Sequence, residues 1–140
     1  MLNNFQKRAL SITLRIVEEN IESIQQILEN GGYSGVLYET RYDITREIRD
    51  EISKRIPPAR AEIEKIADMF HLEKQIGWAS NSAYSKLPYW WEILENARAE
   101  RLKRYGHISM GLGRELDPHL DAIIKILWEM ERILLVIRKM

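Results

Sequence analysis

Residues 120–137 have the sequence LDAIIKILWEMERILLVI, the most apolar stretch of the chain. Its apolar residues recur at intervals of three and four, which predicts a helix rather than a strand. Asp117 and Pro118 precede it as a helix N-cap and a proline at the first helical position, so we expect the helix to begin there. Its last part, residues 133–137, is apolar over more than a full turn and leaves no polar face.

A helix of this kind is either enclosed by its own bundle or covered by a second subunit. Closed dimers are the commonest assembly, and an uncovered apolar patch promotes aggregation. We therefore expect a homodimer whose interface contains the five apolar residues at the end of the helix: Ile133, Leu134, Leu135, Val136 and Ile137.

Two helices are predicted in the first half of the chain. The first carries an apolar stripe over residues 10–28 and ends at Asn30-Gly31-Gly32, because glycine adopts the left-handed conformation of a C-cap. The second begins at a capping box on Thr40 and ends at Pro57-Pro58, since the residue before a proline is forced out of the helical region. Within this second helix, isoleucine recurs every four residues over 44–56. The stripe drifts around the helix by about 40° per step, which predicts that the helix crosses its neighbour obliquely.

Two more helices are predicted before the C-terminal one. The shorter covers residues 63–70, and the longer opens at Pro88 and ends at Tyr105-Gly106. Polar and small residues predict loops over 77–87 and 107–116. The expected fold is therefore all-α: a single-domain helical bundle over residues 1–140, with four long helices and one shorter helix.

Composition limits the function. The 140 residues contain no cysteine, which excludes a disulfide framework, a zinc–thiolate site and a cysteine nucleophile. Lys and Arg total 21, as do Asp and Glu, so a broadly basic nucleic-acid binder is not expected. No apolar run reaches the roughly 20 residues that span a bilayer, and the N-terminus lacks the features of a signal peptide. We expect a cytoplasmic protein with no cofactor and no membrane partner.

Two acidic steps supply one catalytic alternative. Glu19 and Glu22 form an E-x-x-E step, and Glu47 and Asp50 form an E-x-x-D step on the next helix. The spacing resembles the motif of the all-α nucleotide pyrophosphohydrolases. That resemblance implies that the four carboxylates bind Mg²⁺ and that the protein converts nucleoside triphosphates to monophosphates. Helical phase predicts otherwise, because it places Glu19 opposite the apolar stripe of its helix and hence on the surface.

A second catalytic alternative lies in the most basic run of the chain. Arg101 and His107 match the R-x(4–6)-H pattern and so resemble HEPN-domain ribonucleases. The resemblance implies that histidine transfers a proton while arginine holds the phosphate of RNA. In this chain Leu102 replaces the polar residue that usually follows the arginine, and Gly106 ends the helix before the histidine.

Other features favour a protein that acts by association. Adjacent residues are 100° apart on a helix, so one of Trp90 and Trp91 is expected in the core and the other at its border. Residues 102–124 look like part of small helical bacterial proteins of unknown function. The predicted function is that of a non-enzymatic, self-associating helical interaction protein, with the pyrophosphohydrolase and the ribonuclease as alternatives.

Overall fold

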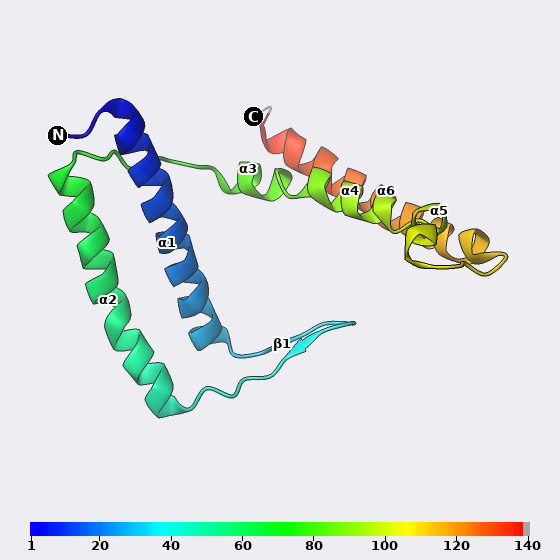
Figure 1. Ribbon diagram of the computed structural model, residues 1–140, viewed down its shortest axis with the longest axis horizontal. Helices are drawn as coiled ribbons and strands as arrows, with labels where there is room; N and C mark the ends of the chain where they lie inside the picture. The colour runs from blue at the N-terminus through cyan, green and yellow to red at the C-terminus, as the bar shows by residue number, and fades with distance from the viewer. Residues whose placement is uncertain (139–140) are drawn as a thin grey trace. The chain divides into compact units, whose positions relative to one another are not determined.

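The computed structural model describes the backbone of residues 1–138 and the side chains of residues 1–137 (Figure 1). The described chain is helical apart from one small β-hairpin, which confirms the all-α class. Contacts within the chain group it into two compact units, Met1–Lys74 and Gln75–Met140, which are described separately. A single domain over residues 1–140 stays a prediction. No helix in the described part of the chain is long and apolar enough to cross a membrane.

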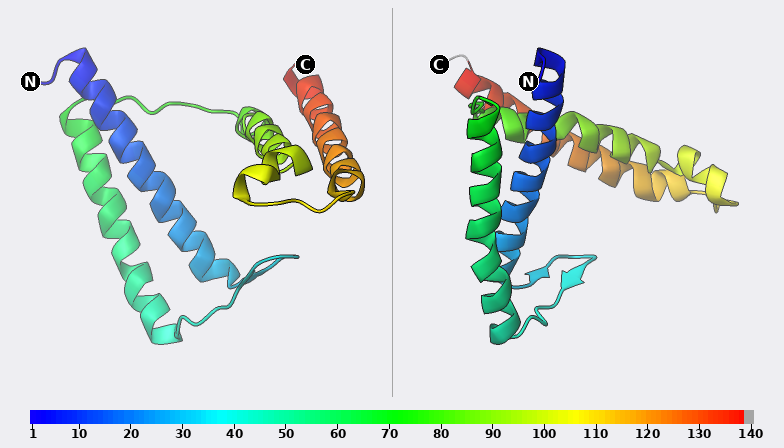
Figure 2. Two further views of the ribbon diagram at one scale, coloured as in Figure 1. Left: turned by 45° about the vertical axis from the view of Figure 1, so that its right-hand side comes forward. Right: turned by 60° about the vertical axis from the view of Figure 1, so that its left-hand side comes forward.

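The first unit is a pair of long helices joined by the β-hairpin. Helices α1 (Asn4–Asn30) and α2 (Arg46–Met69) lie side by side in the views of Figures 1 and 2. Among the described residues of this unit, only Leu28 and Ile56 are buried hydrophobic residues. The rest of the seam is half-buried and has three- and four-residue spacing: Leu10, Leu14, Ile21, Ile63, Ile66 and Ala67.

Helix α1 begins and ends at residues that satisfy its free backbone groups. At its start the Asn3 side chain accepts the Gln6 amide at 2.8 Å, while the Gln6 side chain accepts the Asn3 amide at 2.9 Å. At its end Gly31 has a φ of 77°, and its amide donates to the carbonyl of Ile27. The glycine stop predicted after Asn30 is confirmed.

Helix α2 runs through Pro57 and Pro58 without a break, so the predicted end at the double proline is wrong. Neither proline has an amide hydrogen, and the carbonyls of Ser53 and Lys54 therefore lose their helical donors. Both of those residues are exposed, and water can bind the two carbonyls. Packing of Ile56 against α1 outweighs the local preference of proline.

The start predicted for this helix is also wrong. Thr40 belongs to the β-hairpin of β1 (Tyr33–Ser34) and β2 (Glu39–Thr40), which pair antiparallel. The N-cap is Thr45, whose hydroxyl oxygen accepts the amide of Ile48 at 3.3 Å. A second threonine five residues along the chain offers the same capping chemistry, and the sequence pattern does not distinguish the two.

The isoleucine series of α2 shows the predicted drift. Exposure falls from 50% at Ile48 to 36% at Ile52 and 8% at Ile56. Each four-residue step turns the side chain by about 40°, so only the last of these residues points fully into the seam with α1. The beginning of α2 is accordingly the less covered end of the pair.

The second unit packs short helices along one long helix, as Figure 2 shows. Its elements are α3 (Ala79–Tyr84), α4 (Leu87–Asn96), α5 (Ala99–Leu102), the 3₁₀ helix η1 (Lys103–Tyr105) and α6 (Leu112–Arg138). Helices α3, α4 and α5 all contact α6. The buried residues of this unit lie on these contacts: Leu87, Ala99, Leu120, Ile124 and Leu127.

Three boundaries in this unit differ from the prediction. The loop expected over 77–87 contains α3, and the helix expected over 88–105 is interrupted at Arg98, which is extended. Helix α6 begins at Leu112, five residues before Asp117, so Pro118 lies inside it. The described chain therefore has three long helices with several short ones, rather than four long helices and one shorter helix.

Candidate interaction surface

Helix α6 carries two apolar stripes on different faces. The inner stripe contacts α3, α4 and α5 and contains the buried residues Leu120, Ile124 and Leu127. The second, which we call the outer stripe, lies about 105° around the helix from the inner stripe, at 100° per residue. Its members are spaced three, four, three and four residues apart and are 44–66% exposed: Ile123, Ile126, Met130, Ile133 and Ile137.

The spacing of the outer stripe is that of a coiled-coil seam, in which apolar residues repeat every 3.5 residues on average. Such a seam normally packs against a second helix. In the second unit the short helices cover only the inner stripe, because the outer residues remain exposed over five successive positions.

An apolar groove runs beside the outer stripe. It has a volume of about 300 Å³ and lies between α6 and the α3–α4 segment. Met130 and Ile133 of the outer stripe form one wall, and Trp90 lies on the other. The remaining lining residues are Ala83, Lys86, Leu87 and Leu134. Helix α4 and the outer stripe therefore form one apolar surface.

The tryptophan pair is divided between the two sides of α4. Trp91 is half-buried and packs edge-to-face on Trp128 of α6, with ring centroids 5.5 Å apart and an interplanar angle of 78°. Trp90 is exposed beside the groove. Trp91 is therefore the more covered ring of the pair and Trp90 the more exposed one, and neither ring is fully buried.

Polar contacts fix the far end of α4 against α6. Arg98 donates to both carboxylate oxygens of Glu95, at 2.8 and 3.1 Å, and to Asp121 of α6. These hydrogen bonds hold the pKa of Glu95 below its usual value and raise that of Arg98. Asp117 accepts the amide of Ala99 at 3.0 Å and so caps α5 from α6. These contacts fix α4 and α5 to α6 at the end of α4 remote from the groove.

The five residues predicted as an interface lie on three sides of α6. Ile133 and Ile137 belong to the outer stripe, and Val136 is exposed next to them. Leu134 and Leu135 are half-buried. The sequence interpretation missed Ile123, Ile126 and Met130, because it weighed the uninterrupted apolar run and not the heptad spacing that continues upstream.

The four acidic residues of the predicted Mg²⁺ site are all exposed, as helical phase predicts for Glu19. Glu19 pairs with Arg15 at 3.0 Å, and Glu22 pairs with Arg60 at 2.9 Å. No cluster of three or more acidic or histidine residues suited to a metal occurs among the described residues.

The register of the helix pair separates the two acidic steps. Arg60, which contacts Glu22, is ten residues along α2 from Asp50, or about 15 Å at 1.5 Å per residue. Glu47 lies a further turn away. The long connection that contains the β-hairpin sets this offset, which the spacing of the acidic residues in the sequence does not reveal.

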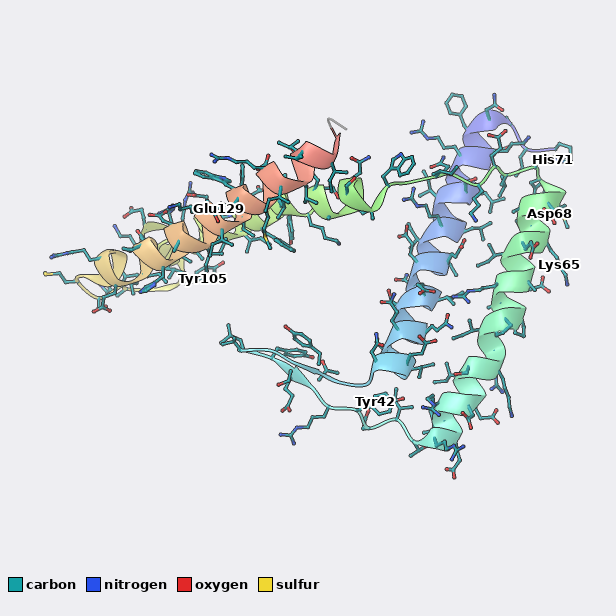
Figure 3. All side chains as sticks on the ribbon, turned by 180° about the vertical axis from the view of Figure 1, so that it is seen from behind. Tyr42, Lys65, Asp68, His71, Tyr105 and Glu129 are labelled. Atoms are coloured by element: carbon teal, nitrogen blue, oxygen red, sulfur yellow. The ribbon has the colours of Figure 1, made fainter. Side chains whose placement is uncertain are left out.

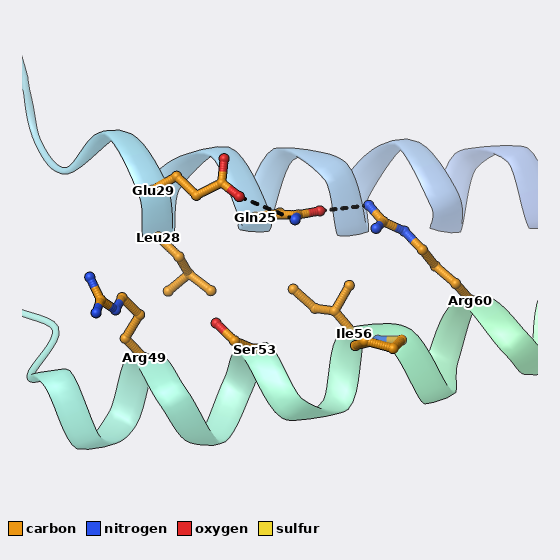
Figure 4. A pocket seen from close by; sticks show the side chains of 8 residues that line it. Gln25, Leu28, Glu29, Arg49, Ser53, Ile56 and Arg60 are labelled. Atoms are coloured by element: carbon orange, nitrogen blue, oxygen red, sulfur yellow. Dashed lines mark hydrogen bonds between the residues drawn. The ribbon is translucent and has the colours of Figure 1, made fainter.

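Hydrogen bonds between α1 and α2 fix the same register. They lie in a pocket of about 280 Å³ between the two helices (Figure 4). Arg60 crosses the seam and donates to Gln25 at 2.7 Å as well as to Glu22. Gln25 donates in turn to Glu29 at 3.2 Å. Because these polar groups already bind one another, they align the two helices and are poorly placed to receive a ligand.

Arg101 and His107 lie in different local structures and are not joined within the described chain. Arg101 lies in α5, whereas His107 follows Gly106, whose φ of 145° takes the chain out of the helical turn. Both side chains are exposed, and among the described contacts no hydrogen bond joins them. The neighbouring Tyr105 is likewise exposed (Figure 3).

Comparison of the chain with protein-family models, with curated proteins and with solved structures finds no match.

Proposed function

We propose that this chain acts by association in the cytoplasm and that it forms a homodimer through the outer stripe of α6. The exposed heptad from Ile123 to Ile137 carries the proposal. A second copy is the partner that the stripe fits best, because a twofold axis places the same seam on both sides. Among the described residues, no such gathering of side chains supports the pyrophosphohydrolase or the ribonuclease.

The strength of the expected dimer follows from the stripe. Fully burying such a side chain is worth about 1.5–3 kcal/mol, and half-covered residues gain roughly 1 kcal/mol each. Ten such residues, five from each chain, contribute about 10 kcal/mol to the free energy of dimerisation. After an association cost of at least about 4 kcal/mol, at most about 6 kcal/mol remains, which corresponds to a dissociation constant of about 40 μM or weaker.

Sedimentation velocity on matched variants tests the proposal. Ile133→Asp places a charge in the outer stripe, whereas Arg132→Asp places the same side chain on the polar face of the same turn. The wild type and Arg132→Asp are expected to sediment mainly as dimers at several hundred micromolar, and Ile133→Asp as a monomer. A wild-type monomer at that concentration, or equal behaviour of the two variants, contradicts the proposal.

Cross-linking adds a test that does not depend on disrupting the interface. Because the natural sequence has no cysteine, Met130→Cys creates a single thiol at the middle of the outer stripe. In an antiparallel pairing about a twofold axis, this residue lies closest to its own copy. Mild oxidation should give a covalent dimer with Met130→Cys and little with Arg132→Cys.

A further inference from the structure

The tip of the β-hairpin in the first unit is its most exposed apolar feature. The amide of Gly35 donates to the carbonyl of Tyr38 at 2.9 Å and closes a turn whose two central residues are Val36 and Leu37. Their side chains are 99% and 97% exposed. Neither residue therefore contributes to packing within the unit.

The turn does not require these two residues. Neither Val36 nor Leu37 has a positive φ, so the backbone of the turn does not demand a particular residue at either position. A branched aliphatic side chain at such a tip gains nothing from the fold and leaves apolar surface in water. The tip sequence is better explained by something that the hairpin touches.

The base of the hairpin is held firmly. A Cβ on Gly32 would overlap the carbonyl oxygen of Thr40, so the two arms meet at a distance that only glycine allows. Tyr42 donates to the carbonyl of Leu28 at 3.1 Å, in the last turn of α1, and lies at the foot of the hairpin in Figure 3. Nearer the tip, the Tyr33 ring lies against Gly35.

Polarity changes in order along the hairpin. The aliphatic pair Val36 and Leu37 comes first, and the exposed rings of Tyr33 and Tyr38 come next. The first charges follow, in the Glu39–Arg41 ion pair of 3.1 Å. Hydrocarbon, then tyrosine, then charge is the order in which side chains partition across a bilayer interface.

Contrary to the sequence-based expectation of no membrane partner, we propose that the hairpin tip inserts into the interface of a lipid bilayer, with Val36 and Leu37 in the acyl region and the two tyrosines at headgroup level. A bilayer fits better than a protein pocket, since leucine and valine are under-represented among the residues that dominate protein interfaces. The tip carries no charge between Tyr33 and Tyr38, so binding should not require anionic lipid.

Two aliphatic residues anchor weakly, and even a single acyl chain binds a bilayer with a constant of only about 10⁴ M⁻¹. Half of the protein should therefore bind at about 0.1 mM lipid or above. Flotation with neutral phosphatidylcholine vesicles up to several millimolar lipid measures this. Val36→Asp/Leu37→Asp should shift the midpoint at least tenfold upward, whereas Met110→Asp, which removes an equally exposed apolar side chain in the other unit, should leave it unchanged.

The insertion of the hairpin tip into the bilayer can be measured with a fluorophore attached to a single introduced cysteine. A polarity-sensitive label on Leu37→Cys should shift to the blue when vesicles are added, and the same label on Lys65→Cys of α2 should not. Three results overturn the proposal: no flotation of the wild type, flotation that the double variant retains, or binding confined to anionic vesicles and abolished by salt. The last would indicate electrostatic adsorption.

Discussion

At the scale of single residues, Asp117 shows what the sequence conveys about capping and what it hides. An aspartate before a proline predicts the N-cap of its own helix, yet this residue lies inside α6 and caps α5. The capping chemistry is as predicted, but the amide it binds belongs to Ala99, 18 residues earlier. The local sequence pattern identifies the side chain that accepts the hydrogen bond. It does not identify the donor, because only folding brings that amide close.

Asp117→Ala should lower the free energy of unfolding of the second unit by about 1 kcal/mol, because the α5 amide loses its acceptor. Asp117→Asn keeps an oxygen and should recover most of the loss. All four tryptophans lie in this unit, so urea unfolding followed by tryptophan fluorescence reports on it selectively. Glu115→Ala, an exposed change in the same helix, serves as the control and should stay within about 0.5 kcal/mol of the wild type.

At the scale of elements, the helix ends marked by glycine were predictable, as was the start of α4 at Pro88, whereas the helix boundaries predicted at Pro57 and Pro118 were wrong. Gly31 and Gly106 end helices because their backbone conformations suit glycine. Pro57 and Pro118 lie inside helices, since burial of neighbouring residues outweighs the loss of a hydrogen bond. The break at Arg98 had no marker in the sequence, because it depends on carboxylates from two helices.

Replacing both prolines of α2, as Pro57→Ala/Pro58→Ala, should stabilise the first unit by about 2 kcal/mol or more. Each alanine restores an amide donor and improves helix propensity, and a smaller gain in unfolded-state entropy opposes it. Guanidinium unfolding followed by far-ultraviolet circular dichroism should show a later transition for α2. Tryptophan fluorescence, which reports on the second unit, should be unchanged; a destabilised variant would show that the prolines favour this helix.

At the scale of the whole molecule, all-helical class followed from periodicity, whereas the candidate surface did not. The stripe from Leu10 to Leu28 and the run from Ile133 to Ile137 each predict a helix wherever the rest of the chain lies. Which face stays uncovered depends on the helices that pack beside it. The heptad spacing of the outer stripe is present in the sequence, but only the packing of α3 and α4 on one side of α6 shows that this stripe stays uncovered.

If two chains share the outer stripe, stability depends on concentration. Raising the protein from about 1 to 100 μM should raise the melting temperature of the wild type by several degrees, because mass action favours the associated state. Arg132→Asp should show the same slope, and Ile133→Asp should melt at one temperature throughout. Differential scanning fluorimetry over a dilution series measures this, and a flat wild-type profile would argue against a dimer.

The closed base of the β-hairpin has an evolutionary consequence. Because the two arms meet where Gly32 faces Thr40, the eight residues between the glycine and Arg41 leave and re-enter the unit at one place. Their side chains can diverge, or the tip can lengthen, without disturbing the seam between α1 and α2. Selection can thus change what the tip touches while the helices that carry it keep their sequence.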